Sequence, residues 1–514
     1  MTAPAGGLIQ SVDWIALAPP AITAVVALLV LVADLFLPAV RKPLLGQAAV
    51  GGLVLAGLSL LPLLHAGRAT FCLTTGSHDC SYVADHFTLV IQLLVLGGAL
   101  LVALLSLNSQ DDLPAGEFWF LLLSSTAGAA LLPAARDLAT LVIALEVASL
   151  PAFALVGLKR GDRLSSEAAL KFFLSSVTAT AVMLLGVSFV YGATGTLHLA
   201  ALADGLGHTP RQLDTLARTG VALTLVGFAF KLAAAPFHFW VPDTYTGAPL
   251  PVAAYLSVVG KASGFSGLIL ITVIAFRHYA DVWGPALAVL AALTMTVGNT
   301  AALRQRPGHP RSAVRLLAWS SVGQAGYLLV PLAAAGYVGP GSDPARHIGA
   351  TVSYALMYGV VNLGAFGVAA LVARTSAGNR IADYRGLYAT RPLAALAMAF
   401  FLLCLAGLPP GIVGLFAKVV VFSSAVDAGL GWLAVVMAVN VVIALYYYLR
   451  WTALLFAQPD AVPTGAEAGG APAAVPALRA PVSLTAAIAL TAVVGLVLSG
   501  APQIVLRFTS GTLF

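Results

Sequence analysis

Long apolar runs, separated by short stretches rich in proline, glycine and charged residues, make up most of the chain. Each run is at helical length, most of them near the about 20 residues that cross a bilayer, and none shows the short alternation of apolar and polar residues that is typical of an outer-membrane barrel strand. The pattern predicts an all-α polytopic membrane protein with about fourteen transmembrane helices. The predicted spans are 14–37, 44–64, 84–107, 117–132, 137–157, 165–191, 219–240, 251–275, 284–303, 311–335, 347–373, 391–424, 430–456 and 481–506.

Composition supports the bilayer as the main solvent. Of the 514 residues, 60% are hydrophobic and only 9% are charged, which is more apolar surface than a water-soluble fold can bury. The first run follows an N-terminal stretch without Lys or Arg and is long enough to span. We therefore expect a transmembrane helix there rather than a cleaved secretory signal.

The distribution of basic residues predicts the orientation. With the N-terminus outside, the connections that begin near residues 38, 158, 304, 374 and 450 face the cytoplasm and carry fifteen Lys and Arg, against seven on the opposite side. Because cytoplasmic loops are enriched in basic residues, both termini are predicted to be extracytoplasmic in a bacterial cell membrane. The net charge of +6 is explained by the placement of basic residues along this topology. It does not indicate a nucleic-acid partner.

Four of the six lysines lie inside apolar runs, whereas all twenty arginines lie in loops or at helix ends. The buried lysines are Lys171, Lys231, Lys261 and Lys418. A guanidinium stays charged at any accessible pH, but a desolvated ammonium can lose its proton. A charge at mid-membrane costs at least about 2.5–3.5 kcal/mol, so each lysine needs a partner, a wet cavity or a function. We expect a proton relay; the alternative is lysines that bond freed carbonyls only for packing.

Glu146, in the span 137–157, is the one carboxylate predicted to lie equally deep. The next span, 165–191, carries Lys171 and follows after a tight connection, so the two helices should be antiparallel neighbours. We predict a Glu146–Lys171 ion pair that releases a proton when it separates. The alternatives are a static ion pair or a Lys171 that reaches the cytoplasmic interface.

Proline interrupts two of the spans. Pro236 follows Lys231 in FKLAAAPFHFWVPDTYTGAP, and Pro409 and Pro410 precede Lys418 in CLAGLPPGIVGLFAK. A proline inside a helix frees the carbonyl four residues earlier, for which water is a natural partner. Interrupted helices at corresponding positions of two halves are typical of inverted-repeat transporters; kinked helices without transport are the alternative.

We therefore expect two inverted five-helix repeats, helices 4–8 and helices 9–13. The predicted domains are the N-terminal helices 1–110, the first antiporter-like repeat 111–283, the second repeat 284–456, a flexible cytoplasmic linker 457–480 rich in Ala, Gly and Pro, and the C-terminal helix 481–514.

Four further polar residues are candidates for accessory roles. His238, beside the first interruption, relays a proton or caps a freed carbonyl. Ser320, Ser321 and Gln324 in the span 311–335 hold a water chain or make ordinary interhelical hydrogen bonds.

The three cysteines, Cys72, Cys80 and Cys404, match no ligand spacing for a metal or an iron–sulfur cluster. No metal site and no redox centre is expected in this chain. Cys72 and Cys80 share one predicted extracytoplasmic loop, where they form either a disulfide or two unpaired thiols.

Several motifs resemble those of a known family. SEAALKFFL, AFKLAAAPFHFWVPDTYTGAP, VGKASGF, RLLAWSSVGQAGYLLV and LAGLPPGIVGLFAK, in this order between about residues 140 and 425, resemble the antiporter-like subunits of respiratory complex I, the proton-translocating NADH:quinone oxidoreductase, and most of all its subunit N. The resemblance implies a non-redox translocase subunit. In it Glu146 pairs with Lys171, Lys231 is central, Lys261 links onward and Lys418 is the exit-side group.

The resemblance also implies partners and cofactors. It places an adjacent antiporter-like subunit and small helical subunits beside this chain in the lipid bilayer, with FMN, iron–sulfur clusters and quinone in other subunits and no cofactor here. Many relatives carry a histidine where this chain has Gln324, which cannot titrate near neutral pH. The alternatives are a subunit of a multisubunit sodium/proton antiporter, which shares the broken helices and lysines, and a purely scaffolding subunit.

Overall fold

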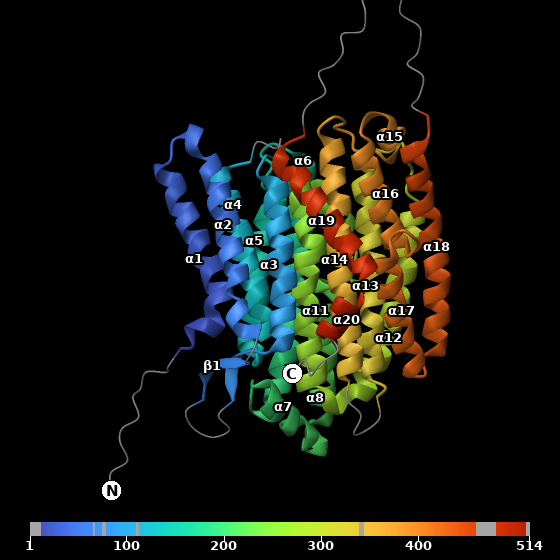
Figure 1. Cartoon of the computed structure of the whole chain (residues 1–514). Helices are drawn as coiled ribbons and strands as arrows, with labels where there is room; N and C mark the ends of the chain where they lie inside the picture. Colours follow the sequence, from blue (N-terminus) through green and yellow to red (C-terminus); the bar gives the residue numbers. More distant parts are fainter. Residues whose placement is uncertain are drawn as a thin grey trace, which may run out of the picture.

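The computed structural model describes residues 12–64, 67–73, 79–108, 113–338, 344–458 and 480–509. Figure 1 shows a bundle of long helices that run side by side, with one short hairpin at its lower end. The hairpin pairs β1 (Arg68–Cys72) with β2 (Cys80–Ala84). The helices are α1 (Trp14–Phe36), α2 (Pro43–Leu58), α3 (His86–Ser106), α4 (Ala115–Leu131), α5 (Leu138–Val156), α6 (Arg163–Thr194), α7 (Leu199–Gly207), α8 (Arg211–Lys231), α9 (Trp240–Gly247), α10 (Leu250–Tyr255), α11 (Lys261–Ile269), α12 (Ala280–Leu303), α13 (Ser312–Ala335), α14 (Ala345–Ala373), α15 (Leu387–Thr390), α16 (Pro392–Ala406), α17 (Ile412–Asp427), α18 (Gly431–Phe456), α19 (Val482–Gly500) and α20 (Gln503–Thr509).

Among the described residues, thirteen helical segments are long and apolar enough to cross a membrane. The shorter apolar helix α16 continues into α17 and adds one interrupted crossing. These crossings match the fourteen predicted spans. The prediction of an all-α polytopic membrane fold is therefore confirmed.

Both predicted interruptions are present. α8 ends at Lys231 and resumes as α9, and α16 ends at Ala406 and resumes as α17. Cis peptide bonds precede Pro236 in the first interruption and Pro410 in the second. Proline lacks the amide hydrogen that continues a helical ladder, and Ala233 leaves helical geometry with a φ of 59°. Lys231 is therefore the last residue of its helix.

A third irregularity has no proline to mark it in the sequence. The span Leu250–Ala275 turns π-helical at Leu256–Gly260, directly before Lys261, and again at Leu270–Ala275. A π turn accommodates an extra residue and is frequent at functional sites. It sets the direction in which the Lys261 side chain leaves the helix.

The core of the bundle surrounds α13 and α14. Within an apolar stretch of 18 residues in each helix, 94% of the residues are buried in α13 and 83% in α14 and in Leu250–Ala275, against 33% in α1, α6 and α18. The inner helices therefore contact protein on nearly every side. Lys261 lies on one of them and is itself only 2% exposed.

The two ends of the described chain lie at the same end of the bundle as the hairpin (Figure 1). Asp13 caps α1 and pairs with Arg68 of β1 at 2.9 Å, and the His86 ring contacts the carbonyl oxygen of Phe508 at 2.5 Å. An even number of crossings produces this arrangement. Which side of the membrane this end faces stays a prediction.

The hairpin contains the predicted disulfide, which joins Cys72 and Cys80. Of the two alternatives left by the sequence, the bonded pair is the one present. Most of the predicted linker 457–480 lies outside the described residues.

Candidate functional site

Lys231 lies at the C-terminal end of α8, where the interruption begins. Its Nζ atom donates hydrogen bonds to Ser149 Oγ on α5 and Ser176 Oγ on α6, both at 2.8 Å, and lies 4.0 Å from Glu146 Oε1. The negative end of the helix dipole also favours a cation at this position. Its side chain is 10% exposed, so the amine is enclosed by two hydroxyls and one carboxylate.

Glu146 is oriented by Thr180 on α6, whose hydroxyl donates to Oε1 at 2.8 Å. The carboxylate therefore faces Lys231 and not Lys171. The predicted Glu146–Lys171 pair is wrong. Helix geometry supplies the reason: Thr180 is nine residues after Lys171 on α6, which is about half a turn around the axis and about 13 Å along it, so the two side chains leave the helix on opposite sides.

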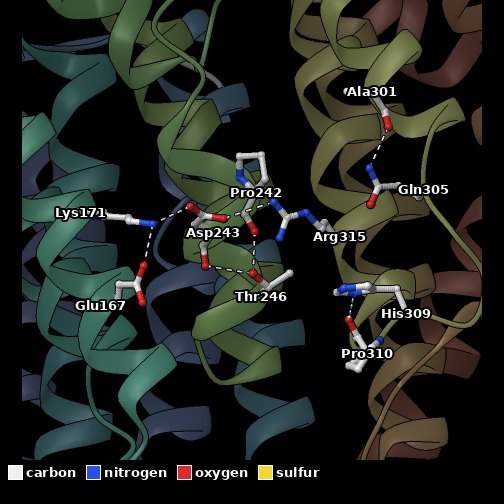
Figure 2. Close-up of polar contacts among 10 residues, drawn as sticks. All are labelled: Glu167, Lys171, Pro242, Asp243, Thr246, Ala301, Gln305, His309, Pro310 and Arg315. Carbon is white, nitrogen blue, oxygen red and sulfur yellow. Dashed lines mark hydrogen bonds and ion pairs between the residues drawn. The ribbon is translucent and has the colours of Figure 1, made fainter.

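Lys171 belongs instead to a separate charged cavity of about 230 Å³ lined by Glu167, Asp243, His309, Arg311 and Arg315 among others. Figure 2 shows the Lys171 amine between Glu167 and Asp243, and Arg315 reaching the same aspartate from the other side. The Lys171 Nζ distances are 2.8 Å to Glu167 Oε1 and 2.9 Å to Asp243 Oδ2, and Arg315 lies 3.4 Å from Oδ1. The side chain of Lys171 is 47% exposed, so it is not a buried charge.

Two stacked rings come from the same helices as Lys171 and Asp243. Phe172 on α6 and Trp240 on α9 stack with centroids 4.4 Å apart. Both rings also line a small cavity of about 30 Å³ that contains Lys231, Ser149 and Tyr255. A space of this size holds one or two water molecules, and this one extends from Lys231 to the π turn before Lys261, since Gly260 and Ser263 line it too.

Lys261 bonds only α13 among the contacts described. Its Nζ atom donates to the hydroxyl of Ser321 at 2.6 Å and to the carbonyl oxygen of the same residue. Tyr358 on α14 donates to that hydroxyl at 2.9 Å. The π turn thus directs the Lys261 amine to Ser321, whose hydroxyl also accepts a hydrogen bond from Tyr358.

The polar residues of α13 continue this network across the bundle. Ser320 bonds the hydroxyl of Tyr448 on α18, Gln324 Nε2 lies 3.4 Å from the same hydroxyl, and the Tyr354 hydroxyl donates to Gln324 Oε1. Every member of this group is buried. Gln324 therefore connects the hydroxyl groups of Tyr448 and Tyr354 through its neutral amide.

Lys418 lies beyond this group, on α17. Its Nζ atom donates to the carbonyl oxygens of Leu405 at 3.0 Å and Ala406 at 2.6 Å, which are the last carbonyls of α16 and have lost their helical partners. A cavity of about 20 Å³ contains Lys418 together with Gln324, Tyr354 and Tyr358. It is large enough for one water molecule.

The polar groups thus follow one another through the bundle in the order Glu146, Lys231, Lys261, Gln324 and Lys418. Ser149, Ser321 and two tyrosines lie between them. No group of three or more His, Cys, Asp or Glu residues in the described part of the chain could hold a metal ion. The arrangement can pass protons, and it contains no metal-ligand set in the described ranges.

Known proteins share this sequence and this fold. A family model described as NADH:quinone oxidoreductase/Mrp antiporter, TM, matches residues 135–444. The chain is 73% identical to NADH-quinone oxidoreductase subunit N 2 of Streptomyces griseus, with 100% of this chain and 96% of the relative covered. The chain belongs to the subunit N family of NADH:quinone oxidoreductase.

Solved structures agree with this family. A chain of respiratory complex I from Thermus thermophilus is 33% identical, with a TM-score of 0.73 over 96% of this chain and 100% of that chain. A chain of the Mrp complex from Dietzia sp. DQ12-45-1b is 23% identical, with a TM-score of 0.78 over 96% of each, and shows a shared fold alone. This subunit is thus an antiporter-like, multi-pass membrane-arm subunit of a bacterial respiratory complex.

Within this subunit N family member, His238 occupies the interruption itself. Its ring centroid lies 5.5 Å from that of Trp319 on α13, and the side chain is half-buried. The neighbouring Ala235 amide donates to Thr294 Oγ1 at 2.9 Å. The interruption is therefore tied to α12 and α13 through backbone and ring contacts.

Sequence reasoning missed the neutral partners of the lysines. Ser149, Ser176, Tyr358 and Tyr448 look like ordinary helix residues in the sequence. Their spacing carried one usable signal: Ser149 lies three residues after Glu146, on the same face of α5. Asp243, seven residues after Pro236, was also passed over, although a carboxylate beside a helix break is unusual in a membrane span.

Proposed function

We propose that this subunit translocates protons across the membrane by a relay through Glu146, Lys231, Lys261 and Lys418. The observation that carries the proposal is the enclosure of three lysine amines among hydroxyls, carbonyls and one carboxylate, with two water-sized cavities between them. An amine can give up its proton, and a guanidinium cannot.

The relay begins at the Glu146–Lys231 pair. While both groups are charged they stabilise each other at 4.0 Å, and a change in the field at Glu146 alters the balance between the charged and neutral amine. Water in the cavity beside Lys231 then connects it to the π turn at Lys261. From there Ser321, Tyr358 and Gln324 lead to Lys418.

Lys171 has a different part in this proposal. Together with Glu167 and Asp243 it forms the charged cavity from which protons reach the relay. The stacked Phe172 and Trp240 rings line the small cavity beside Lys231, next in sequence to Lys171 and three residues before Asp243. The distribution of Lys and Arg supports a cytoplasmic position for this end of the bundle, with both termini on the other side.

The chain itself carries no electrons in this scheme. FMN, iron–sulfur clusters and quinone belong to partner subunits, and quinone reduction there supplies the change in field that drives the relay. A neighbouring antiporter-like subunit and small helical subunits complete the membrane arm. The two inverted repeats, 111–283 and 284–456, provide one interrupted helix each.

Proton pumping by the reconstituted complex tests the proposal. Lys418→Ala should lower NADH-driven proton uptake several-fold in sodium-free proteoliposomes, whereas Lys42→Ala, which changes a lysine that pairs with Asp34 at 3.0 Å outside the relay and the cavities, should leave it unchanged. Equal pumping by both variants would exclude the relay. Proton transport that requires sodium, by a purified assembly that does not oxidise NADH, would instead favour the sodium/proton antiporter.

A further inference from the structure

A second, larger cavity of about 280 Å³ lies beside the charged cavity. Its lining includes Lys159, Arg311 and Arg374, and no Asp or Glu is among the described residues that line it. Arg311 and Thr246 belong to the walls of both cavities. This space, named the basic cavity below, therefore gathers positive charge where its neighbour mixes both signs.

The basic cavity lies at the level where helices start and stop. Leu105 is in the last turn of α3, Ala373 is the last residue of α14, and Val314 and Leu484 are in the first turns of α13 and α19. In a membrane protein this level corresponds to the lipid headgroups. The cavity thus combines a basic polar wall with an apolar wall that includes Leu105, Val314 and Leu484.

Hydrogen bonds hold its arginines in place. Arg311 Nη1 donates to the Thr246 carbonyl oxygen at 2.7 Å, and Arg374 Nη1 donates to the Asn108 carbonyl oxygen at 2.8 Å. Arg311 Nη2 also lies 3.6 Å from Asp162 Oδ2, a carboxylate that is not part of the cavity wall. Each guanidinium has five N–H donors, so the donors that these contacts do not use are left for a further acceptor.

The backbone around the basic cavity is strained. Arg311 has a φ of 57° and Asn379 a φ of 38°, and both residues line the cavity. The two strained segments bond each other, since the Arg311 amide donates to the Gly378 carbonyl oxygen at 2.6 Å. Such a conformation costs on the order of 1–3 kcal/mol and persists only where the surrounding structure fixes it; here it sets the direction of the Arg311 side chain.

We propose that the basic cavity binds a phosphate-bearing anion, supplied by the headgroup of an anionic phospholipid. Guanidinium groups pair with phosphate oxygens in a bidentate manner, and basic pockets between transmembrane helices accept anionic headgroups. Free phosphate shares this chemistry, but the apolar wall of Leu105, Val314 and Leu484 fits the start of an acyl chain. The bound phosphate group would lie next to Arg311, which also lines the charged cavity.

Photo-crosslinking of the intact complex in nanodiscs tests the site. The probe is phosphatidylglycerol with a diazirine on its headgroup, at one part in ten of phosphatidylcholine. We expect crosslinks on the segments 245–251 and 370–379, reduced at least fivefold by Arg374→Gln and partly restored by Arg374→Lys, which keeps the charge but cannot pair in a bidentate manner. Arg306→Gln removes an exposed charge from the same end of the bundle and should leave the crosslinks unchanged.

Two further arms identify the source of the phosphate group. Labelling that persists in excess inorganic phosphate supports the lipid headgroup, and labelling that phosphate abolishes supports the free anion at the same site. Equal labelling by a phosphatidylcholine probe, or labelling that Arg374→Gln leaves intact in assembled complex, would overturn the proposal.

Discussion

Glu146 on α5 and Lys231 on α8 face each other, with 4.0 Å between the carboxylate oxygen and the amine nitrogen. Thr180 fixes the carboxylate, and Ser149 and Ser176 fix the amine. The pair is the one contact between a carboxylate and the three enclosed lysine amines in the described residues. It makes Lys231 the point at which a distant change in charge can act.

Removing the charge of Glu146 should slow proton transfer. Two charges 4 Å apart interact by about 4 kcal/mol at an effective dielectric constant of 20, and the 25% exposure of the Glu146 side chain weakens this. If about 1.4 kcal/mol remains, Glu146→Gln lowers the pumping rate of the reconstituted complex about tenfold. Thr180→Val, which removes only the orienting hydroxyl, should cost less; an E146Q complex that pumps at the wild-type rate would contradict this.

Lys171 should be energetically coupled to Asp243 and not to Glu146. In double-mutant cycles on the pumping rate, Lys171→Ala and Asp243→Asn should be non-additive by about 0.2–1 kcal/mol, the range for exposed ion pairs. Lys171→Ala and Glu146→Gln should be additive, because the two side chains lie on separate networks. A larger coupling for the second pair would restore the pairing that the sequence suggested.

The sequence predicts the crossings well because each one depends on local properties. About 20 consecutive apolar residues specify a span wherever they occur, and Pro236 and Pro410 mark the two interruptions directly. The four lysines stand out for the same reason, since a charge in an apolar run is visible without knowledge of its neighbours.

The close contact between α12 and α13 at Gly298 should contribute to the stability of the subunit. A Cβ added at Gly298 on α12 would lie 2.3 Å from the backbone nitrogen of Gly323 on α13, so the two helices would have to move apart. Gly298→Ala should destabilise the subunit by about 1–3 kcal/mol, seen as a lower thermal transition of the purified complex. Gly57→Ala on α2 meets nothing within 4 Å and serves as the matched control, with unchanged or slightly raised stability.

The disulfide between Cys72 and Cys80 should determine how many cysteines react with a thiol label. Without reduction, Cys72 and Cys80 should take up no maleimide, because they are joined, and the buried Cys404 should react only after unfolding. Reduction followed by unfolding should add the mass of three labels. Three labels on unfolded, unreduced protein would show that the disulfide is absent.

Contacts between side chains on different helices could not be predicted from the sequence. Whether Glu146 meets Lys171 or Lys231 depends on the rotation of α6, which turns about 100° per residue; the tight connection between α5 and α6 gave their adjacency but not their facing sides. The π turn before Lys261 has no proline signal, and Tyr448 approaches Ser320 from a helix more than 100 residues later.

The central claim is that Lys231 exchanges protons, and proton uptake by proteoliposomes containing the intact complex tests it most directly. With NADH and quinone supplied, Lys231→Ala should abolish proton uptake per electron through this subunit while the assembled complex retains its FMN and iron–sulfur signals. Lys231→Arg, which keeps the charge but does not release its proton, should be equally defective. Wild-type proton uptake by either assembled variant would contradict the account.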